Sequence, residues 1–338
     1  LTRLVGADRD LIFVHSQAGQ VTQLSDESLS LLFQQLQTAY SNTRLYSDLL
    51  ELNLAMERFV PDSTLRHFNH DSVSNIELGQ QAELEASTLS LDIRGFTTLC
   101  EHLSSNQSFT FVNSILKVLG PVVERHHGSI VKFVGDGIIA LFSRNQHHAV
   151  DAVECGVALA EKVRLFNKEV DTIKKIVSEP IRVGIGIHSG RVHLATVGST
   201  SRLDVSVRSS SVSQAENLQT FTKPFGVTIL VDDSCAQKLE TLDGLRYIGL
   251  TPVESETRSQ LYQVIAGEEV GLQEQVRDQG HEFSQAIRTL ENRSASEALS
   301  MFESLQGGAL RDPVVEYFVR RSAQEVEDRR IDDDPPKS

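Results

Sequence analysis

Two strand-like apolar runs constrain the fold of this chain most strongly, because an aspartate stands at the end of each strand-like stretch. Asp92 closes the first run, and the residues after it predict a turn into a helix that begins near Thr97. In the second run, 131–142, the pair Asp136-Gly137 stands between two apolar halves, which is typical of a hairpin. The pattern therefore predicts strands that present carboxylates at their ends.

The two aspartates are expected to meet in space. If the two runs form neighbouring strands, the helical stretch 97–127 joins them as a right-handed crossover, and Asp92 and Asp136 meet at one end of the sheet. Two carboxylates beside a helix N-terminus could hold a divalent metal ion over a polyphosphate, because the metal needs anionic oxygens and the phosphates need N–H donors. Strand parity also places Lys132 on the same side as Asp136.

Five motifs occur in an order and spacing that one protein family shares. They are Asp-Ile-Arg-Gly-Phe-Thr at 92–97, Lys-Phe-Val-Gly-Asp-Gly at 132–137, Gly-Ile-Gly-Ile-His-Ser-Gly at 184–190, Val-Gly-Ser at 197–199 and Arg-Leu-Asp at 202–204. With these motifs the chain resembles the catalytic domain of class III nucleotidyl cyclases, the adenylyl and guanylyl cyclases. The resemblance ends near Leu-Tyr-Gln-Val at 261–264.

The resemblance implies an α+β fold, a ferredoxin-like palm with the element order β-α-β-β-α-β, over residues 84–266. The apolar pattern along the chain predicts elements that fit this order. The expected helices are 104–127 and 147–168, and the expected later strands are 181–187, 191–197, 203–207, 227–231 and 245–248.

The resemblance also implies a site for two metal ions, Mg²⁺ or Mn²⁺. The ions would be bound by Asp92, Asp136 and the backbone carbonyl of Ile93. One ion would activate the ribose 3′-hydroxyl for in-line attack on the α-phosphorus, and the other would hold the β- and γ-phosphates. The backbone N–H groups of the following turn would bind the phosphates. This turn consists of Arg94, Gly95, Phe96 and Thr97.

Two catalytic positions of the family differ in this chain. Ser213 stands where the family has an asparagine that orients the ribose, and Asn217 stands where it has an arginine that neutralises charge on the phosphate. Serine is too short to reach the ribose, and asparagine is uncharged. A positioned arginine in phosphoryl transfer is worth ~10³–10⁵ in rate, so a homodimer of this chain is expected to be weak or inactive.

Neighbouring residues offer little replacement for the missing arginine. Arg208 and Arg191 could each move into the site, although both are more simply interpreted as surface arginines. The run Ser209-Ser210-Ser211 replaces a Gly-Asp-Thr turn of the family and is interpreted as a loop that has drifted in sequence.

A division of labour between two chains is known in the family and fits this pattern. In mammalian transmembrane adenylyl cyclases, the first half keeps both aspartates, and the second half supplies the asparagine and the arginine. The chain resembles that first half, except that it keeps Lys132 at the position that reads the purine, with Ser206 at the accompanying position. Lysine with a hydroxyl favours ATP over GTP. The alternative for Lys132 is an ordinary solvated lysine on a strand.

Three functions were compared on this basis. The first is an adenylyl cyclase that converts ATP to 3′,5′-cyclic AMP and pyrophosphate, as a homodimer or as a heterodimer with a chain that supplies the missing residues. The second is an inactive pseudo-cyclase that acts as a regulatory dimerisation or nucleotide-binding module. The third is another two-metal enzyme with a palm, such as a diguanylate cyclase or a polymerase. It is disfavoured because residues 135–138 lack the Gly-Gly-Asp/Glu-Glu-Phe signature of a diguanylate cyclase.

Segments before the cyclase-like region suggest a signalling protein. Residues 1–24 predict a hairpin with strands at 11–15 and 21–24, as the end of an upstream segment, and 59–83 form a linker with a Phe-Val-Pro element. Residues 25–58 predict a helix with a heptad seam, which favours a coiled coil over a single amphipathic helix. The seam consists of Leu29, Leu32, Leu36, Ala39, Thr43, Tyr46, Leu50 and Asn53.

A helical appendage is expected over 267–328, with helices at 269–291, 294–306 and 313–328. One pair of these helices resembles a tetratricopeptide-like unit, which cannot bury its apolar face alone and should dock on the core or on a partner chain. Residues 329–338 are expected to be a disordered acidic tail.

Composition narrows the classes of partner. The net charge of −14 argues against a nucleic-acid partner. The three cysteines share no metal-ligand spacing and suit a reducing compartment. No apolar run is long enough to span a membrane, so a cytoplasmic location is expected. The first residue is Leu1 rather than methionine, which suggests the cytosolic part of a larger sensor protein.

Overall fold

The computed structural model forms two compact units, Leu1–Asp62 and Ser63–Ser338. The structure describes residues 3–7, 10–14, 26–57, 67–68, 75–101, 103–169, 180–199, 202–251, 258–292 and 294–333.

The N-terminal unit holds a hairpin of β1 (Arg3–Ala7) and β2 (Asp10–Val14). The strand expected at 11–15 is present as β2, but its partner is β1, because the nearer apolar residues Leu4 and Val5 pair with Phe13 and Ile12. The second strand expected, 21–24, lies outside the described residues.

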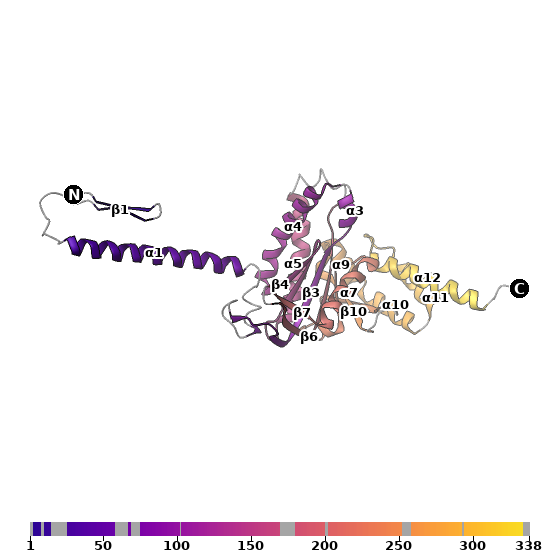
Figure 1. The fold of residues 1–338 in the computed structure, drawn as a ribbon. Helices are drawn as coiled ribbons and strands as arrows, with labels where there is room; N and C mark the ends of the chain where they lie inside the picture. Colours follow the sequence, from indigo (N-terminus) through magenta and orange to yellow (C-terminus); the bar gives the residue numbers. More distant parts are fainter. Residues whose placement is uncertain are drawn as a thin grey trace. The chain divides into compact units, whose positions relative to one another are not determined.

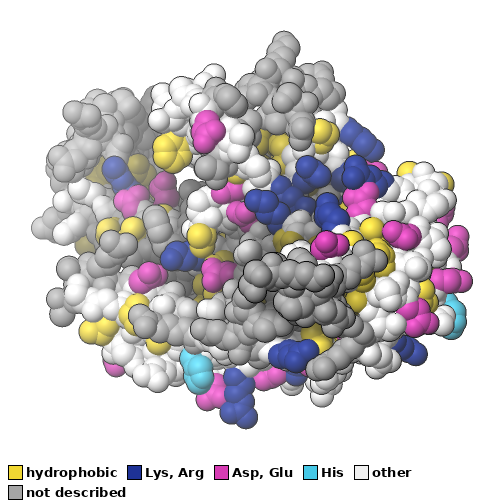
Figure 2. Space-filling view, turned by 90° about the vertical axis from the view of Figure 1, so that its right-hand side faces the viewer, with side chains coloured by type: hydrophobic (Ala, Val, Ile, Leu, Met, Phe, Trp, Pro, Cys, Tyr) yellow, Lys and Arg dark blue, Asp and Glu magenta, His cyan; other side chains and the backbone are white. Residues whose placement is uncertain are grey.

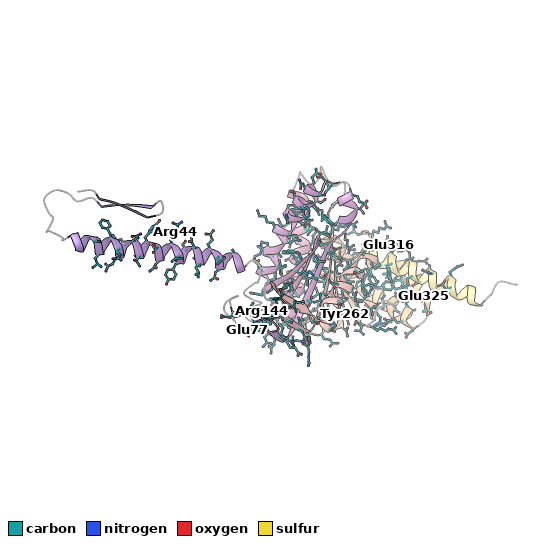
Figure 3. The ribbon with its side chains drawn as sticks, viewed as in Figure 1. Arg44, Glu77, Arg144, Tyr262, Glu316 and Glu325 are labelled. Carbon is teal, nitrogen blue, oxygen red and sulfur yellow. The ribbon has the colours of Figure 1, made fainter. Side chains whose placement is uncertain are left out.

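The helix expected at 25–58 is present as α1 (Asp26–Glu57). Side chains project from both sides of this helix (Figure 3), and the seam residues Leu32, Leu36 and Tyr46 are exposed. The hydroxyl of Thr43, also on the seam, donates a 2.9 Å hydrogen bond to the carbonyl of Ala39, so this polar group is satisfied within the helix. The coiled coil itself stays a prediction.

The second unit contains the expected α+β palm (Figure 1). Its strands β4, β5, β3 and β6 lie side by side in that order, which is the strand order of a ferredoxin-like β-α-β-β-α-β fold. The elements in chain order are β3 (Gln81–Ile93), α3 (Phe96–Glu101), α4 (Ser105–Arg125), β4 (Gly128–Val134), β5 (Gly137–Phe142), α5 (His148–Glu169) and β6 (Val183–Ser199).

The sheet continues beyond β6 in the order β8-β10-β9, and β7 pairs with the outer half of β6. Of these strands, β10 was not predicted as one. The elements are β7 (Arg202–Arg208), α7 (Ser210–Phe225), β8 (Ile229–Asp232), α8 (Asp233–Ala236), β9 (Leu245–Leu250) and β10 (Gln260–Val264).

The two aspartate-bearing runs are neighbours, but β3 pairs with β5, the second half of the run 131–142, and not with β4. The reason is burial. Every residue of β5 is buried, so this strand belongs inside the sheet, whereas β4 exposes Lys132, Phe133 and Val134 at the edge. The hairpin turn also differs from the expected one, in which Asp136 and Gly137 were the central pair. Its two central residues are Gly135, with φ 60°, and Asp136.

The two strands expected at 181–187 and 191–197 form one strand, β6. Its residues from Val183 to Ala195 pair with the whole of β3. The gap left between the two expected strands at 188–190 is therefore part of a continuous strand. A Cβ atom at Gly190 would lie 3.1 Å from both His188 Nε2 and Ser211 Oγ, so this glycine allows a close approach between side chains.

Helices cover both faces of the sheet (Figure 1). On one face, α4 and α5 bury a cluster that includes Leu89, Leu91 and Ile185. On the other, α7 lies across β6 where the strand has Gly184 and Gly186. A Cβ atom at Gly186 would lie 2.2 Å from the backbone of α7, so only glycine permits this packing.

Four helices follow the sheet: α9 (Val270–Asp278), α10 (Gly280–Glu291), α11 (Ala295–Leu305) and α12 (Pro313–Asp333). The single helix expected at 269–291 is divided at Gln279, which ends α9 and begins α10. The helix α12 continues to Asp333, into the segment expected to be disordered.

The last three helices share one hydrophobic cluster with α7 and with the strands β8, β9 and β10. A buried ion pair crosses this interface, since Arg246 Nη1 of β9 lies 2.7 Å from Asp312 Oδ2 before α12. The Arg246 guanidinium also lies 3.6 Å from the centre of the Phe283 ring on α10. The helices therefore complete the core of the palm from which they follow.

Candidate functional site

The end of β3 and the β4–β5 turn bring Asp92 and Asp136 together, as the sequence predicted. The backbone N–H of Ile93 donates a 3.3 Å hydrogen bond to Asp136 Oδ2. Gly137 makes this approach possible, because a Cβ atom there would lie 2.6 Å from the carbonyl oxygen of Leu91 and 3.6 Å from Asp92 Oδ1. Sequence reasoning assigned Gly137 to a turn and missed this role.

The environment of both carboxylates disfavours their charged forms. Burial raises the pKa of Asp92. Burial and the neighbouring charge of Asp92 raise the pKa of Asp136 from 3.8 to about 6. Two carboxylates that repel each other in a partly buried place are stabilised by a cation between them.

We expect metal binding at this site to weaken as the pH falls through about 6, because a proton then competes for Asp136. Calorimetric titration of Mn²⁺ at pH 7.5 and pH 5 measures this. Without metal, the raised pKa has the opposite consequence for folding: Asp136 favours the folded state below about pH 4, and this contribution is lost as the pH rises through about 6.

The control is Asp243→Asn, which removes an exposed carboxylate elsewhere and should leave both titrations unchanged. Equal Mn²⁺ affinity at the two pH values would contradict the assignment of Asp136 as a ligand.

The donor atoms at the site fit Mg²⁺ or Mn²⁺. In the described part of the chain, no third His, Cys, Asp or Glu joins Asp92 and Asp136 in a metal-binding group. Carboxylate oxygens are hard ligands that suit these ions, and Mg²⁺ usually takes its other ligands from waters and substrate phosphates. The backbone carbonyl of Ile93, next to Asp92 in the chain, is the remaining protein ligand proposed.

The turn proposed for phosphate binding is only partly available. Gly95, with φ 73°, turns the chain into α3, and Phe96 stacks on Phe111 with ring centres 6.1 Å apart. The N–H of Arg94, however, already donates a 2.8 Å hydrogen bond to the carbonyl of Arg182. The N–H groups left for a phosphate are those of residues 95–97, at the N-terminus of α3.

The Arg94 side chain points away from the aspartates. Its Nη2 donates hydrogen bonds to the carbonyls of Thr222, at 3.0 Å, and Val227. Burial and the charge of Arg182 lower its pKa. Sequence reasoning could not find this role, because the acceptors follow far later in the chain.

The two residues proposed to read the purine lie on separate strands of the sheet. Lys132 is exposed on the edge strand β4, and Ser206 is partly exposed on β7, with β5, β3 and β6 between them. The parity argument for Lys132 does not hold, because β4 ends at Val134 and Asp136 belongs to the turn. The structure brings neither residue to the aspartates through a recorded contact.

Ser213 and Asn217 are exposed on α7, whereas Ala215 and Leu218 of the same helix face the sheet. Both positions therefore lie on the side of α7 that a second chain could approach. The serine run before them is not a drifted loop. Ser209 is the N-cap of α7, where its Oγ accepts a 3.0 Å hydrogen bond from the N–H of Ser211.

The alternative arginines give no sign of replacing the missing one. Arg191 is exposed on β6 and forms an ion pair with Glu83 at 3.3 Å. Arg208 ends β7, where its backbone pairs with His193, and its side chain lies outside the described part of the structure.

Comparison with known proteins places these observations in a family. Residues 80–262 match the family model of the adenylate and guanylate cyclase catalytic domain. An adenylate cyclase of Anabaena cylindrica is 30% identical over 227 residues, which are 67% of this chain and 43% of that protein. Adenylate cyclase 1 of Rhizobium meliloti is 23% identical and covers 75% of this chain and 40% of its own length. The chain thus spans less than half the length of these two relatives.

The fold is also found in solved structures. A bacterial light-regulated adenylyl cyclase superposes with a TM-score of 0.58 at 17% identity, over 70% of this chain and 67% of that one.

In the part of the chain that the structure describes, no helix combines the length and the hydropathy needed to span a membrane.

Proposed function

The chain belongs to the adenylate and guanylate cyclase catalytic domain family, and we propose that it is the metal-binding half of an adenylyl cyclase. With a second chain it would convert ATP to 3′,5′-cyclic AMP and pyrophosphate. Members of the family act on nucleotides, form dimers and generally depend on a divalent metal. The observation that carries the proposal is the meeting of Asp92 and Asp136, each with a raised pKa, at one end of the sheet.

Asp92, Asp136 and the turn that follows Asp92 form one arm of the proposed site, here called the first arm, and each has a role that its position supports. Ser213 and Asn217 on α7 form the second arm. Asp92, Asp136 and the Ile93 carbonyl would hold the two metal ions, and the N–H groups at the start of α3 would bind the β- and γ-phosphates. The ions, when bound, supply activation of the ribose 3′-hydroxyl and charge neutralisation. Lys132 and Ser206 lie apart from these aspartates and do not belong to this arm; by the resemblance they would read the adenine.

The second arm supports a requirement for another chain. Asn217 carries no charge to balance the transition state, and Ser213 offers only a short hydroxyl. Both are exposed on α7, so each chain of a dimer would present a deficient arm to its partner's aspartates. The same deficiency favours the second candidate, a pseudo-cyclase that binds metal and nucleotide without turnover.

A mixing experiment tests the division of labour. One partner is the wild-type chain. The other is a variant with Ser213→Asn and Asn217→Arg that also carries Asp92→Asn, so it can supply only the second arm. We expect cyclic AMP from ATP and Mn²⁺ in the mixture and almost none from either chain alone, because only the mixed dimer holds a complete site.

The control is wild-type chain mixed with the Asp92→Asn variant alone, which should stay silent. GTP is assayed in parallel and should be the poorer substrate. No activity in a mixture that forms mixed dimers and binds Mn²⁺–ATP would contradict the cyclase proposal and favour the pseudo-cyclase.

A further inference from the structure

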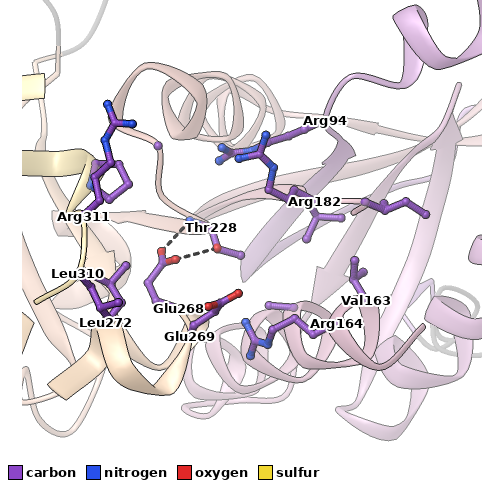
Figure 4. A pocket seen from close by; sticks show the side chains of 15 residues that line it. Arg94, Val163, Arg164, Arg182, Thr228, Glu268, Glu269, Leu272, Leu310 and Arg311 are labelled. Atoms are coloured by element: carbon purple, nitrogen blue, oxygen red, sulfur yellow. Dashed lines mark hydrogen bonds between the residues drawn. The ribbon is translucent and has the colours of Figure 1, made fainter. Parts of the chain in front are cut away.

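A cavity of about 380 Å³ lies beside the end of β3, where Arg94 follows the strand, and between the sheet and the C-terminal helices. Its walls come from the end of β3, α5, the start of β6, the start of β8 and the segments around α9 and α12 (Figure 4). The volume is within the range of small-molecule sites, ~300–1,000 Å³. The cavity is separate from the proposed nucleotide site, since Arg94 points into it and away from Asp92 and Asp136.

Charged side chains dominate the cavity. Four arginines line it, with two glutamates, so its lining is positively charged in a chain whose net charge is −14. Basic side chains also gather in one area of the face drawn in Figure 2. The lining arginines are Arg94, Arg164, Arg182 and Arg311, and the glutamates are Glu268 and Glu269.

Two of the arginines, Arg94 and Arg182, form no ion pair with a residue that the structure describes. The guanidinium groups of Arg94 and Arg182 lie side by side on one wall, across from Glu268 and Glu269, close enough for their charges to repel (Figure 4). Arg94 Nε is buried without a hydrogen-bond partner in the described structure. For the Arg182 side chain, no hydrogen bond or ion pair with a described residue is recorded, although its backbone carbonyl accepts from Arg94.

Three of the four other charged groups of the cavity, all but the exposed Glu269, are already engaged. The Glu268 carboxylate accepts hydrogen bonds from the N–H of Thr228 at 2.8 Å, from its hydroxyl at 3.0 Å and from Gln263 at 3.2 Å. Arg164 donates to the carbonyl of Gly267 at 2.8 Å, and Arg311 pairs with Glu316. Glu268 is thus held in place by neutral donors, and its charge acts on Arg94 across the cavity without forming an ion pair in the described structure.

We propose that this cavity binds a small organic anion whose carboxylate or phosphate oxygens lie between the guanidinium groups of Arg94 and Arg182. Guanidinium groups bind both kinds of oxyanion through paired hydrogen bonds, which are stronger than those between neutral groups. The apolar side chains of Val163, Leu272 and Leu310 line the same cavity and would contact the carbon part of the ligand. The site does not depend on whether the chain turns over ATP.

Calorimetric titration of the full chain with citrate and with glucose 6-phosphate tests the proposal and separates the two ligand chemistries. The protein is first stripped of metal ions on a chelating resin, so binding through a metal at Asp92 and Asp136 does not contribute. We expect saturable binding of at least one probe. Arg182→Gln should weaken it about tenfold or more, because a charge-assisted hydrogen bond is lost, and Arg182→Lys should weaken it less.

The matched control is Arg125→Gln, which removes an exposed arginine at the end of α4, outside the cavity, and should leave the affinity unchanged. Arg182 is itself exposed, so its variants should keep the thermal unfolding midpoint of the wild type. No saturable binding of either probe, or equal affinity in wild type and Arg182→Gln, would overturn the proposal.

Discussion

The double substitution Ser213→Asn with Asn217→Arg is expected to raise cyclic AMP production by a homodimer about 10³-fold or more, since a positioned arginine in phosphoryl transfer is worth ~10³–10⁵. Both positions are exposed on α7, so the larger side chains meet no packed neighbours and the helix should persist. The first arm, with Asp92 and Asp136, is already in place. Production of cyclic AMP and cyclic GMP with Mn²⁺ measures the gain.

Thr220→Arg is the matched control, because it adds the same charge at an exposed position of the same helix, one turn beyond Asn217 and at neither of the two family positions. It should leave the activity at the level of the parent. Two results would count against the proposal: a double variant that binds Mn²⁺–ATP but stays as silent as the parent, or a parent that is already fully active.

Substituting Gly186 by alanine is expected to lower the free energy of unfolding by about 3 kcal/mol or more, at the upper end of overpacking costs. The added Cβ atom would lie 2.2 Å from the carbonyl oxygen of Ala215 and the nitrogen of Gln219. Both are backbone atoms of α7, so relief requires the whole helix to shift. Since α7 carries Ser213 and Asn217, the change should also disturb the second arm.

Urea unfolding followed by circular dichroism measures this cost. Gly244→Ala serves as control, because no heavy atom lies within 4 Å of a Cβ atom built there. Its effect should stay within about 0.5 kcal/mol, as for most surface substitutions. A Gly186→Ala variant as stable as the control would mean that α7 does not lie against β6 as described.

The palm could be predicted because five motifs carry a resemblance to class III cyclases, and the apolar pattern of the helices and strands fits that fold. The neighbours of each strand in the sheet were not predicted, although the apolar pattern of the strands distinguishes a central strand from an edge strand. The run 138–142 is wholly apolar, as a central strand requires, while 131–134 includes a lysine, as an edge strand allows. Two strands, 181–187 and 191–197, were expected where the structure has the single strand β6, because a glycine such as Gly190 suits a tight turn and a close contact equally well.

Within the site, the aspartates could be predicted because each stands in a motif that fixes the local backbone. The direction of the Arg94 side chain could not, since the carbonyls of Thr222 and Val227 that it contacts are brought near only by the tertiary fold. The cavity was missed for the same reason. Arg182 and Glu268 stand in no motif, and only the folded chain places them on facing walls.

The buried ion pair between Arg246 and Asp312 limits which fragments of this protein can fold on their own. The family match ends at residue 262, between these two residues, and a fragment cut there would keep the guanidinium and lose its carboxylate. The fragment would also expose the apolar residues of β8 and β9 that α10 and α12 now cover. The C-terminal helices and the sheet therefore share one core, and a domain exchange at the boundary of the family match would divide it.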